Sequence, residues 1–200
     1  FAGMLIGGRY LLRPVFRFAS CDVWEYDFAP HDVGRYPYAA GQVYGLGKEG
    51  ENREFCYDNG AIFPFYYEYP AGLSVYDVRD QMPVEESGNM MILTAAVCEL
   101  ERSGAFAAPY YEVLKTWAGY LLAYGEDPGE QLCTDDFAGH LAHNTNLAVK
   151  AIMGIKAFAR ILELLGDDSE SMRYRSQAAA MAAVWETTAR GKGHTALTFG

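Results

Sequence analysis

Apolar residues recur at the spacing of an α-helix over most of the chain after residue 86. The pattern predicts helices at about 89–102, 110–124, 138–165 and 170–190. Gly104, Gly125 and Gly166 follow the first three runs, where glycine commonly ends a helix. Asp168 or Ser169 is expected to cap the last helix, whose alanines suit close packing against another helical surface.

The first 82 residues contain one helical run followed by a long irregular region. Residues 4–19 fit a helix, in which Pro14 is expected to introduce a kink or to begin a second segment. Over residues 20–82, prolines and glycines recur too often for long helices. Within this region, residues 28–37 place a histidine, an aspartate and an arginine between aromatic side chains. Long ordered loops in compact domains are usually functional, so this stretch is a candidate part of a site.

The connections between the predicted helices alternate between short and long. Short connections join the first helix to the second and the third to the fourth, which predicts antiparallel hairpins. Each hairpin is preceded by an acidic pair, Glu85–Glu86 and then Asp135–Asp136, at an interval of 50 residues. Such recurrence is typical of helical repeats. The chain is therefore predicted to be all-α, with consecutive antiparallel helical hairpins and a long loop region, rich in proline, glycine and tyrosine, at 20–82.

Hairpins that pack side by side gather their long connections at one end. We therefore expect residues 28–37, 80–89 and 127–144 to converge on one cleft that holds several carboxylates. At least two of these segments should bring carboxyl groups within about 10 Å, the separation range of working carboxylate pairs.

Charge and composition exclude several classes of protein. The 200 residues carry a formal net charge of −10, which argues against binding nucleic acid, because phosphate contacts need clustered positive charge. No segment approaches about 18 uncharged apolar residues, so no membrane span is predicted. The four cysteines form no C-x-x-C pair, which disfavours structural zinc. Cys98 is expected to pack as a small apolar residue, and the sequence leaves open whether Cys21 and Cys56 pair.

Carboxylates are the candidate catalytic groups, namely Asp32, Glu85, Glu86, Asp135 and Asp136. Adjacent residues on a helix point about 100° apart, so Glu85 and Glu86 cannot both face one substrate atom. The simpler interpretation of either residue is favourable negative charge at the start of a helix. One of Asp135 and Asp136 is likewise expected to cap a helix or bind backbone. Asp32 has no helix to cap nearby, which favours catalysis or substrate contact.

His140 and His143 are three residues apart, which places them on one face of the predicted 138–165 helix. Together with Asp135 or Asp136 they could hold a metal ion. No third ligand lies at a spacing typical of a metal site, so no metal is predicted. His143 and Asn144 are instead expected to line the cleft or to hydrogen-bond the acidic loop. Lys150 either neutralises a buried carboxylate or is surface charge.

Other nucleophilic designs lack support in the sequence. Neither Ser-x-x-Lys nor Gly-x-Ser-x-Gly occurs, so a serine-dependent mechanism has no motif. A thiol mechanism needs Cys133 to meet His140, seven residues on, and the spacing does not require that they meet. Carboxylate-assisted attack of water is the mechanism that remains, and no cofactor is predicted.

Four groups of motifs, in order along nearly the whole chain, carry a resemblance to a known family. They are Ala29-Pro30-His31-Asp32 with Gly34 and Tyr36-Pro37; Met82-Pro83-Val84-Glu85-Glu86-Ser87-Gly88-Asn89-Met90; Asp127-Pro128 with Gln131-Leu132-Cys133-Thr134-Asp135-Asp136-Phe137-Ala138-Gly139-His140; and His143-Asn144 with Asn146-Leu147, Lys150-Ala151-Ile152 and Gly154. The chain resembles the glutaminase A family of fungi and bacteria. The candidate substrate contacts within these motifs are His31, Tyr36, Asn89, His140, His143 and Asn144.

The resemblance implies part of an (α/α)6 toroid of the six-hairpin glycosidase type, in a secreted or periplasmic protein. Residues 1–82 then supply a leading helix and active-site loops, and residues 83–200 supply two helical hairpins of the same domain. Each hairpin of a toroid buries faces against both of its neighbours. We therefore expect that the chain is not a self-contained monomer, and that the remainder of the toroid or another copy of the chain covers its open faces.

The family name implies a small-molecule substrate and the hydrolysis of L-glutamine to L-glutamate and ammonia. The implied fold resembles glycoside hydrolases, which use a pair of carboxylates as acid and base, so glycoside hydrolysis is the alternative. A non-catalytic fragment is the third possibility. Release of ammonia from glutamine, compared with release of sugar from oligosaccharides, separates the three.

Overall fold

The computed structural model of the protein describes residues 2–20, 24–31, 81–134 and 140–200. These residues form an all-α fold, as predicted. The α-helices are α1 (Ala2–Ala19), α4 (Pro83–Glu101), α5 (Tyr111–Tyr124), α6 (Thr145–Leu165) and α7 (Asp168–Thr188), and two short 3-10 helices, η3 (Gly104–Phe106) and η4 (Ala108–Tyr110), connect α4 to α5. In the described part of the chain, no helix has both the length and the apolar character that crossing a membrane requires.

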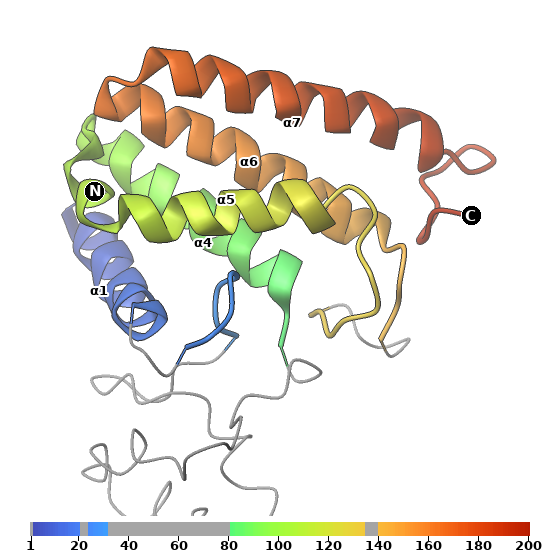
Figure 1. Cartoon of the computed structure of the whole chain (residues 1–200), viewed down its shortest axis with the longest axis horizontal. Coiled ribbons are helices and arrows are strands. Elements are labelled where there is room, and N and C mark those ends of the chain that lie inside the picture. The colour runs from blue at the N-terminus through green and yellow to red at the C-terminus, as the bar shows by residue number, and fades with distance from the viewer. Residues whose placement is uncertain (1, 21–23, 32–80, 135–139) are drawn as a thin grey trace, which may run out of the picture.

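Helices α4 and α6 are packed against each other and run in the same direction (Figure 1). Near their starts Lys150 of α6 binds Glu85 of α4, and near their ends Arg160 of α6 binds Glu99 of α4. Helices α5 and α7 each follow a connection and return against the helix before them. The predicted antiparallel hairpins are therefore confirmed, and the two hairpins meet through their first helices.

Two glycines allow the backbones of α4 and α6 to approach closely. A Cβ added to Gly154 of α6 would lie 2.9 Å from the Cα of Gly88 in α4. A Cβ added to Gly88 would lie 2.9 Å from the carbonyl oxygen of Lys150. Since real Cβ contacts are longer than this, the glycine pair sets the distance between the two helices.

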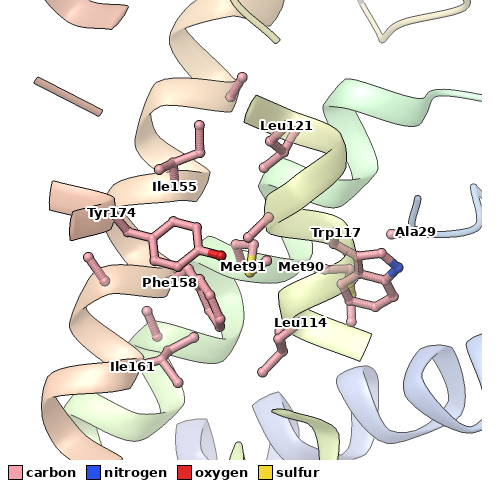
Figure 2. Close-up of a cluster of buried hydrophobic side chains, with 14 of the residues drawn as sticks. Ala29, Met90, Met91, Leu114, Trp117, Leu121, Ile155, Phe158, Ile161 and Tyr174 are labelled. Atoms are coloured by element: carbon pink, nitrogen blue, oxygen red, sulfur yellow. The ribbon is translucent and has the colours of Figure 1, made fainter. Parts of the chain in front are cut away.

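Aromatic rings join the outer helices to one another and to this central pair. Phe16 of α1 stacks on Trp117 of α5, with ring centroids 5.4 Å apart. On the opposite side of the core, the rings of Tyr174 in α7 and Phe158 in α6 meet edge to face, with centroids 4.9 Å apart (Figure 2). Full burial of one large apolar side chain stabilises a fold by about 1.5–3 kcal/mol, so these rings contribute strongly to the core. Cys98 is fully buried in the same core, as predicted for a small apolar residue.

Only one stripe of α7 is buried. Tyr174, Ala178 and Met181 face the core at helical spacing, whereas Ala179 and Ala183 are exposed. The alanine-rich sequence therefore packs closely on one side, and its other side is open in the described residues.

The starts of α4 and α6 differ from the predicted boundaries. Helix α4 begins at Pro83 instead of 89, because a proline in the first turn lacks only an N–H that would have no helical partner. Helix α6 begins at Thr145 instead of 138, because Asn144 caps it. Glu85–Glu86 thus lies inside the first turn of its helix, whereas Asp135–Asp136 precedes its helix by several residues. The two acidic pairs are not equivalent positions of a repeat.

Two other local predictions were wrong. Helix α4 ends at a left-handed Arg102, with φ of 52°, and not at Gly104. Gly104 is instead required for packing, because a Cβ there would lie 2.7 Å from Leu165. Helix α7 is capped by Asp167, whose side chain accepts a hydrogen bond from the Glu170 N–H, and not by Asp168 or Ser169. Helix α1 continues through Pro14, so of the two predicted effects of this proline a second segment is excluded and a kink stays a prediction.

Candidate functional site

The start of α4 binds a loop that lies about 50 residues earlier in the sequence. The Ala29 N–H donates to Ser87 Oγ at 3.0 Å, and the His31 N–H donates to Gln81 Oε1 at 3.1 Å. Ser87 and Gln81 are both fully buried. These two contacts hold the described end of the 28–37 loop against the helix.

Glu85, the third residue of α4, binds the connection that precedes α6. Its Oε1 accepts hydrogen bonds from Lys150 Nζ and Thr134 Oγ1, both at 2.6 Å, and its Oε2 accepts the Thr134 N–H at 2.8 Å. The residue is 2% exposed. Burial raises the pKa of the Glu85 carboxyl, but the hydrogen bonds from Lys150 and Thr134 outweigh it, so this pKa lies below its ordinary value. Lys150 therefore neutralises a buried carboxylate, which was one of its two predicted roles.

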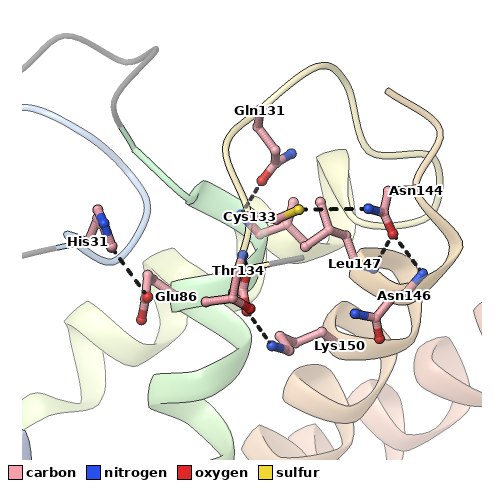
Figure 3. A network of polar contacts seen from close by, with 11 residues as sticks. His31, Glu86, Gln131, Cys133, Thr134, Asn144, Asn146, Leu147 and Lys150 are labelled. Carbon is pink, nitrogen blue, oxygen red and sulfur yellow. Dashed lines mark hydrogen bonds and ion pairs between the residues drawn. The ribbon is translucent and has the colours of Figure 1, made fainter. Parts of the chain in front are cut away.

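Glu86 faces His31 (Figure 3), whereas Glu85 binds Lys150 and Thr134. Different partners are expected for neighbours on a helix, which point about 100° apart. Glu86 Oε1 lies 3.6 Å from His31 Nδ1, and the two side chains keep 20% and 23% of their surface exposed. A carboxylate beside an imidazole at the edge of solvent can exchange protons with a bound molecule. This pair is therefore a candidate for acid–base chemistry.

The connection between α5 and α6 is fixed by the residues just before α6. His143 Nδ1 lies 2.7 Å from Asp127 Oδ1, and the backbone of His143 has a φ of 60°. His143 and His140 precede the helix, so the prediction that they share a helix face was wrong. The prediction that His143 hydrogen-bonds the acidic connection is confirmed. His140 is exposed.

Asn144 has a structural role at the start of α6. Its Oδ1 accepts the N–H groups of Asn146 and Leu147 at 2.9 and 3.2 Å, and its amide donates to Cys133 Sγ at 3.8 Å. Both ends of this buried side chain are engaged within the protein. Its predicted contact with the connection is thus present, whereas substrate binding by Asn144 remains a prediction.

Replacing Asn144 with alanine is expected to lower the free energy of unfolding by about 1 kcal/mol, because two backbone N–H groups lose their cap. Asn144→Asp is the matched control, since aspartate caps a helix equally well. Urea unfolding at neutral pH measures both. Equal destabilisation by the two substitutions would show that the contact with Cys133, and not the cap, is the important one.

Together these contacts join the described parts of the three segments that were predicted to converge. Gln131 completes the set, because its Oε1 accepts the Val84 N–H at 3.0 Å. The candidates Asp32, Tyr36, Asp135 and Asp136 lie outside the described residues, as do Cys21 and Cys56. Asn89 is half-buried on α4. The catalytic and substrate-binding roles of all the candidate residues stay predictions.

Sequence reasoning did not select four residues that build this site, namely Gln81, Ser87, Gln131 and Thr134. They bind through a backbone N–H, a hydroxyl group or an uncharged acceptor, and such contacts leave no periodic or charged pattern in a sequence. Ser87, Gln131 and Thr134 do lie within the motifs that carry the family resemblance, which is the signal that could have found them.

Other features of the described residues do not coincide with this site. A hollow of about 220 Å³ lies between the end of α1 and α5, where Trp24, Tyr26 and Asp27 are among its lining residues, but none of the candidate residues lines it. Within the described ranges, no group of three or more histidine, cysteine, aspartate and glutamate side chains is arranged to hold a metal ion.

The fold is an all-α array of antiparallel hairpins, with carboxylates at the start of a central helix. The chain is therefore a helical-hairpin protein. The chain belongs to the glutaminase A family: the model of the glutaminase A six helical-hairpin domain matches residues 7–200. The family and the fold class inferred from the motifs are both confirmed.

Two curated proteins are similar to this chain over much of its length. Glutaminase A of Aspergillus oryzae is 32% identical over 164 residues, which cover 79% of this chain and 23% of that protein. A probable glutaminase of Arthroderma benhamiae is 37% identical over 197 residues, which cover 70% of this chain and 22% of that protein. The chain thus spans less than a quarter of the length of these relatives. No solved structure gives a significant match.

Proposed function

We propose that the protein hydrolyses L-glutamine to L-glutamate and ammonia. The observation that carries this proposal is the match of residues 7–200 to the glutaminase A hairpin domain. The names of the two similar proteins, a glutaminase A and a probable glutaminase, agree with it.

Glu86 is assigned the role of general base in this proposal. Its carboxylate takes a proton from a water molecule while the water oxygen bonds to the carboxamide carbon of glutamine. The carbon–nitrogen bond then breaks, and the proton passes to the departing nitrogen, which leaves as ammonia. His31, 3.6 Å away, orients the carboxylate and the water. Glu85 is assigned a supporting role, because both of its oxygens already accept hydrogen bonds inside the protein.

Glu86→Gln is expected to lower kcat for ammonia release by about 10²- to 10⁴-fold, the usual contribution of a general base. The matched control is Glu112→Gln, which removes the same charge from an exposed position on α5 and should leave the rate unchanged. Ammonia and glutamate are measured together from L-glutamine, and sugar release is measured from a panel of oligosaccharides. Full activity in Glu86→Gln would overturn the assignment of the base.

The two assays also separate the candidate functions. Sugar release without ammonia would replace the amidase proposal with a glycoside hydrolase. Neither product from the folded protein would favour a non-catalytic role for this part of the chain.

A further inference from the structure

Two buried side chains hold His31 opposite Glu86. Ser87 Oγ accepts the Ala29 N–H at 3.0 Å, and Gln81 Oε1 accepts the His31 N–H at 3.1 Å. Because both acceptors are fully buried, water does not compete for these backbone groups. The His31 ring then lies 3.6 Å from the Glu86 carboxylate.

The two acceptors flank Glu86 in the sequence. Ser87 follows it directly on α4, and Gln81 lies just before the helix begins. The helix holds Glu86 through its own backbone, whereas the loop that carries His31 is joined to the start of α4 by these two contacts, beside the burial of Phe28 and Ala29 in the core. Loss of either acceptor is therefore expected to displace His31 while Glu86 stays in place.

We propose that Gln81 and Ser87 are positioning residues, which set the placement of His31 at the Glu86 carboxylate and thereby the rate of glutamine hydrolysis. This inference rests on the proposed function. Both residues act through the backbone of 29–31 and not on the substrate. A displacement of about 1 Å in a catalytic group can cost about a hundredfold in rate, so contacts of this kind have a measurable effect.

Ser87→Ala and Gln81→Met each remove one acceptor and change side-chain volume little. Each is expected to lower kcat for ammonia release about tenfold or more, with KM changed less than about threefold. In a His31→Gln background, Ser87→Ala should cost less than about twofold, because a residue that acts through His31 has no further effect once the imidazole is gone. Because the variants target different backbone groups, either one decides the question if the other fails to fold.

Thr145→Val is the matched structural control. Thr145 Oγ1 donates to the Ala196 carbonyl at 2.6 Å from an equally buried position, so the variant also loses a side chain–backbone hydrogen bond. Its kcat should stay within about twofold of the unsubstituted protein. If Thr145→Val lowers kcat as much as Ser87→Ala does, or if the effects of Ser87→Ala and His31→Gln multiply, the positioning role is excluded.

A second readout does not depend on activity. The chain has four histidines, so the ring signals of a sample labelled at histidine can be assigned by single substitutions. The His31 signal should move in Ser87→Ala and in Gln81→Met and stay unchanged in Thr145→Val. An unchanged His31 signal in both folded variants overturns the inference. Absence of ammonia release from the unsubstituted protein refutes the proposed function alone, and the His31 signal then still decides whether these contacts position the ring.

Discussion

Replacing Lys150 with methionine is expected to lower the free energy of unfolding by about 3 kcal/mol, measured by urea unfolding at pH 7. The substitution leaves the Glu85 carboxylate, which is 2% exposed, without its cation, and removal of one partner of a buried ion pair typically costs about 3–5 kcal/mol. The lower end of that range applies because the Lys150 side chain is 23% exposed and water can partly replace it. Lys156→Met, at an exposed position on the same helix, is the control and should change stability by less than about 0.5 kcal/mol.

The same ion pair predicts a dependence of stability on pH. The pKa of Glu85 is lower in the folded protein than in the unfolded chain. Its contribution is therefore fully present above the unfolded value of about 4.3 and is lost as the pH falls through the folded value. The double variant Glu85→Gln with Lys150→Met should show a smaller loss of stability on acidification. An identical acid dependence in the double variant would show that other carboxylates control it.

Gly154→Ala and Gly88→Ala are each expected to destabilise the protein by about 2–3 kcal/mol. In either variant the new methyl carbon would lie 2.9 Å from a backbone atom of the facing helix, so α4 and α6 would have to move apart. Alanine gains up to about 1 kcal/mol over glycine in helix propensity, but this gain is smaller than the cost of overpacking. Thermal and urea unfolding measure the difference.

Gly119 on α5 is a control in which an added methyl group meets no neighbouring atom. It is exposed, and a Cβ there would have no heavy atom within 4 Å. Gly119→Ala should therefore stabilise the protein by up to about 1 kcal/mol, because only the helix propensity changes. A stabilising effect at Gly154 as well would mean that the two helices are not in close contact at this point.

The hydrophobic pattern was sufficient to predict which parts of the chain are helical, but not the residues at which the helices begin. Periodicity reports the buried stripe of a helix, and it located the bodies of α4, α5, α6 and α7 well. A start is decided by one side chain and its partners, and Asn144 is recognisable as a cap only once its contacts with the next backbone N–H groups are seen. Gly104 was wrongly predicted to end a helix, because the sequence alone does not distinguish a glycine needed for close packing from a glycine that ends a helix.

The candidate site was predictable in outline through its charged residues. Glu85 and Glu86 stood out as a pair, but their different surroundings depend on α6 and on the 29–31 loop, which no local pattern reveals. The secreted or periplasmic location stays a prediction, and so does the covering of open faces by the remainder of the toroid or another copy. Leu93 and Met153, on α4 and α6, are about half exposed in the described residues and mark where such a covering surface can be sought.

The polar contacts at the start of α4 have a consequence for how the protein folds. They join residues that are 47 to 65 positions apart in the sequence, whereas α6 and α7 are neighbours along the chain. Contacts of high sequence separation form late, because the closure of long loops costs entropy before the contacts offset it. A partly folded chain can therefore retain the α6–α7 hairpin and have no site at all. The proposed activity should then disappear with the first cooperative unfolding step, and amide hydrogens of α6 and α7 should remain protected from exchange after it.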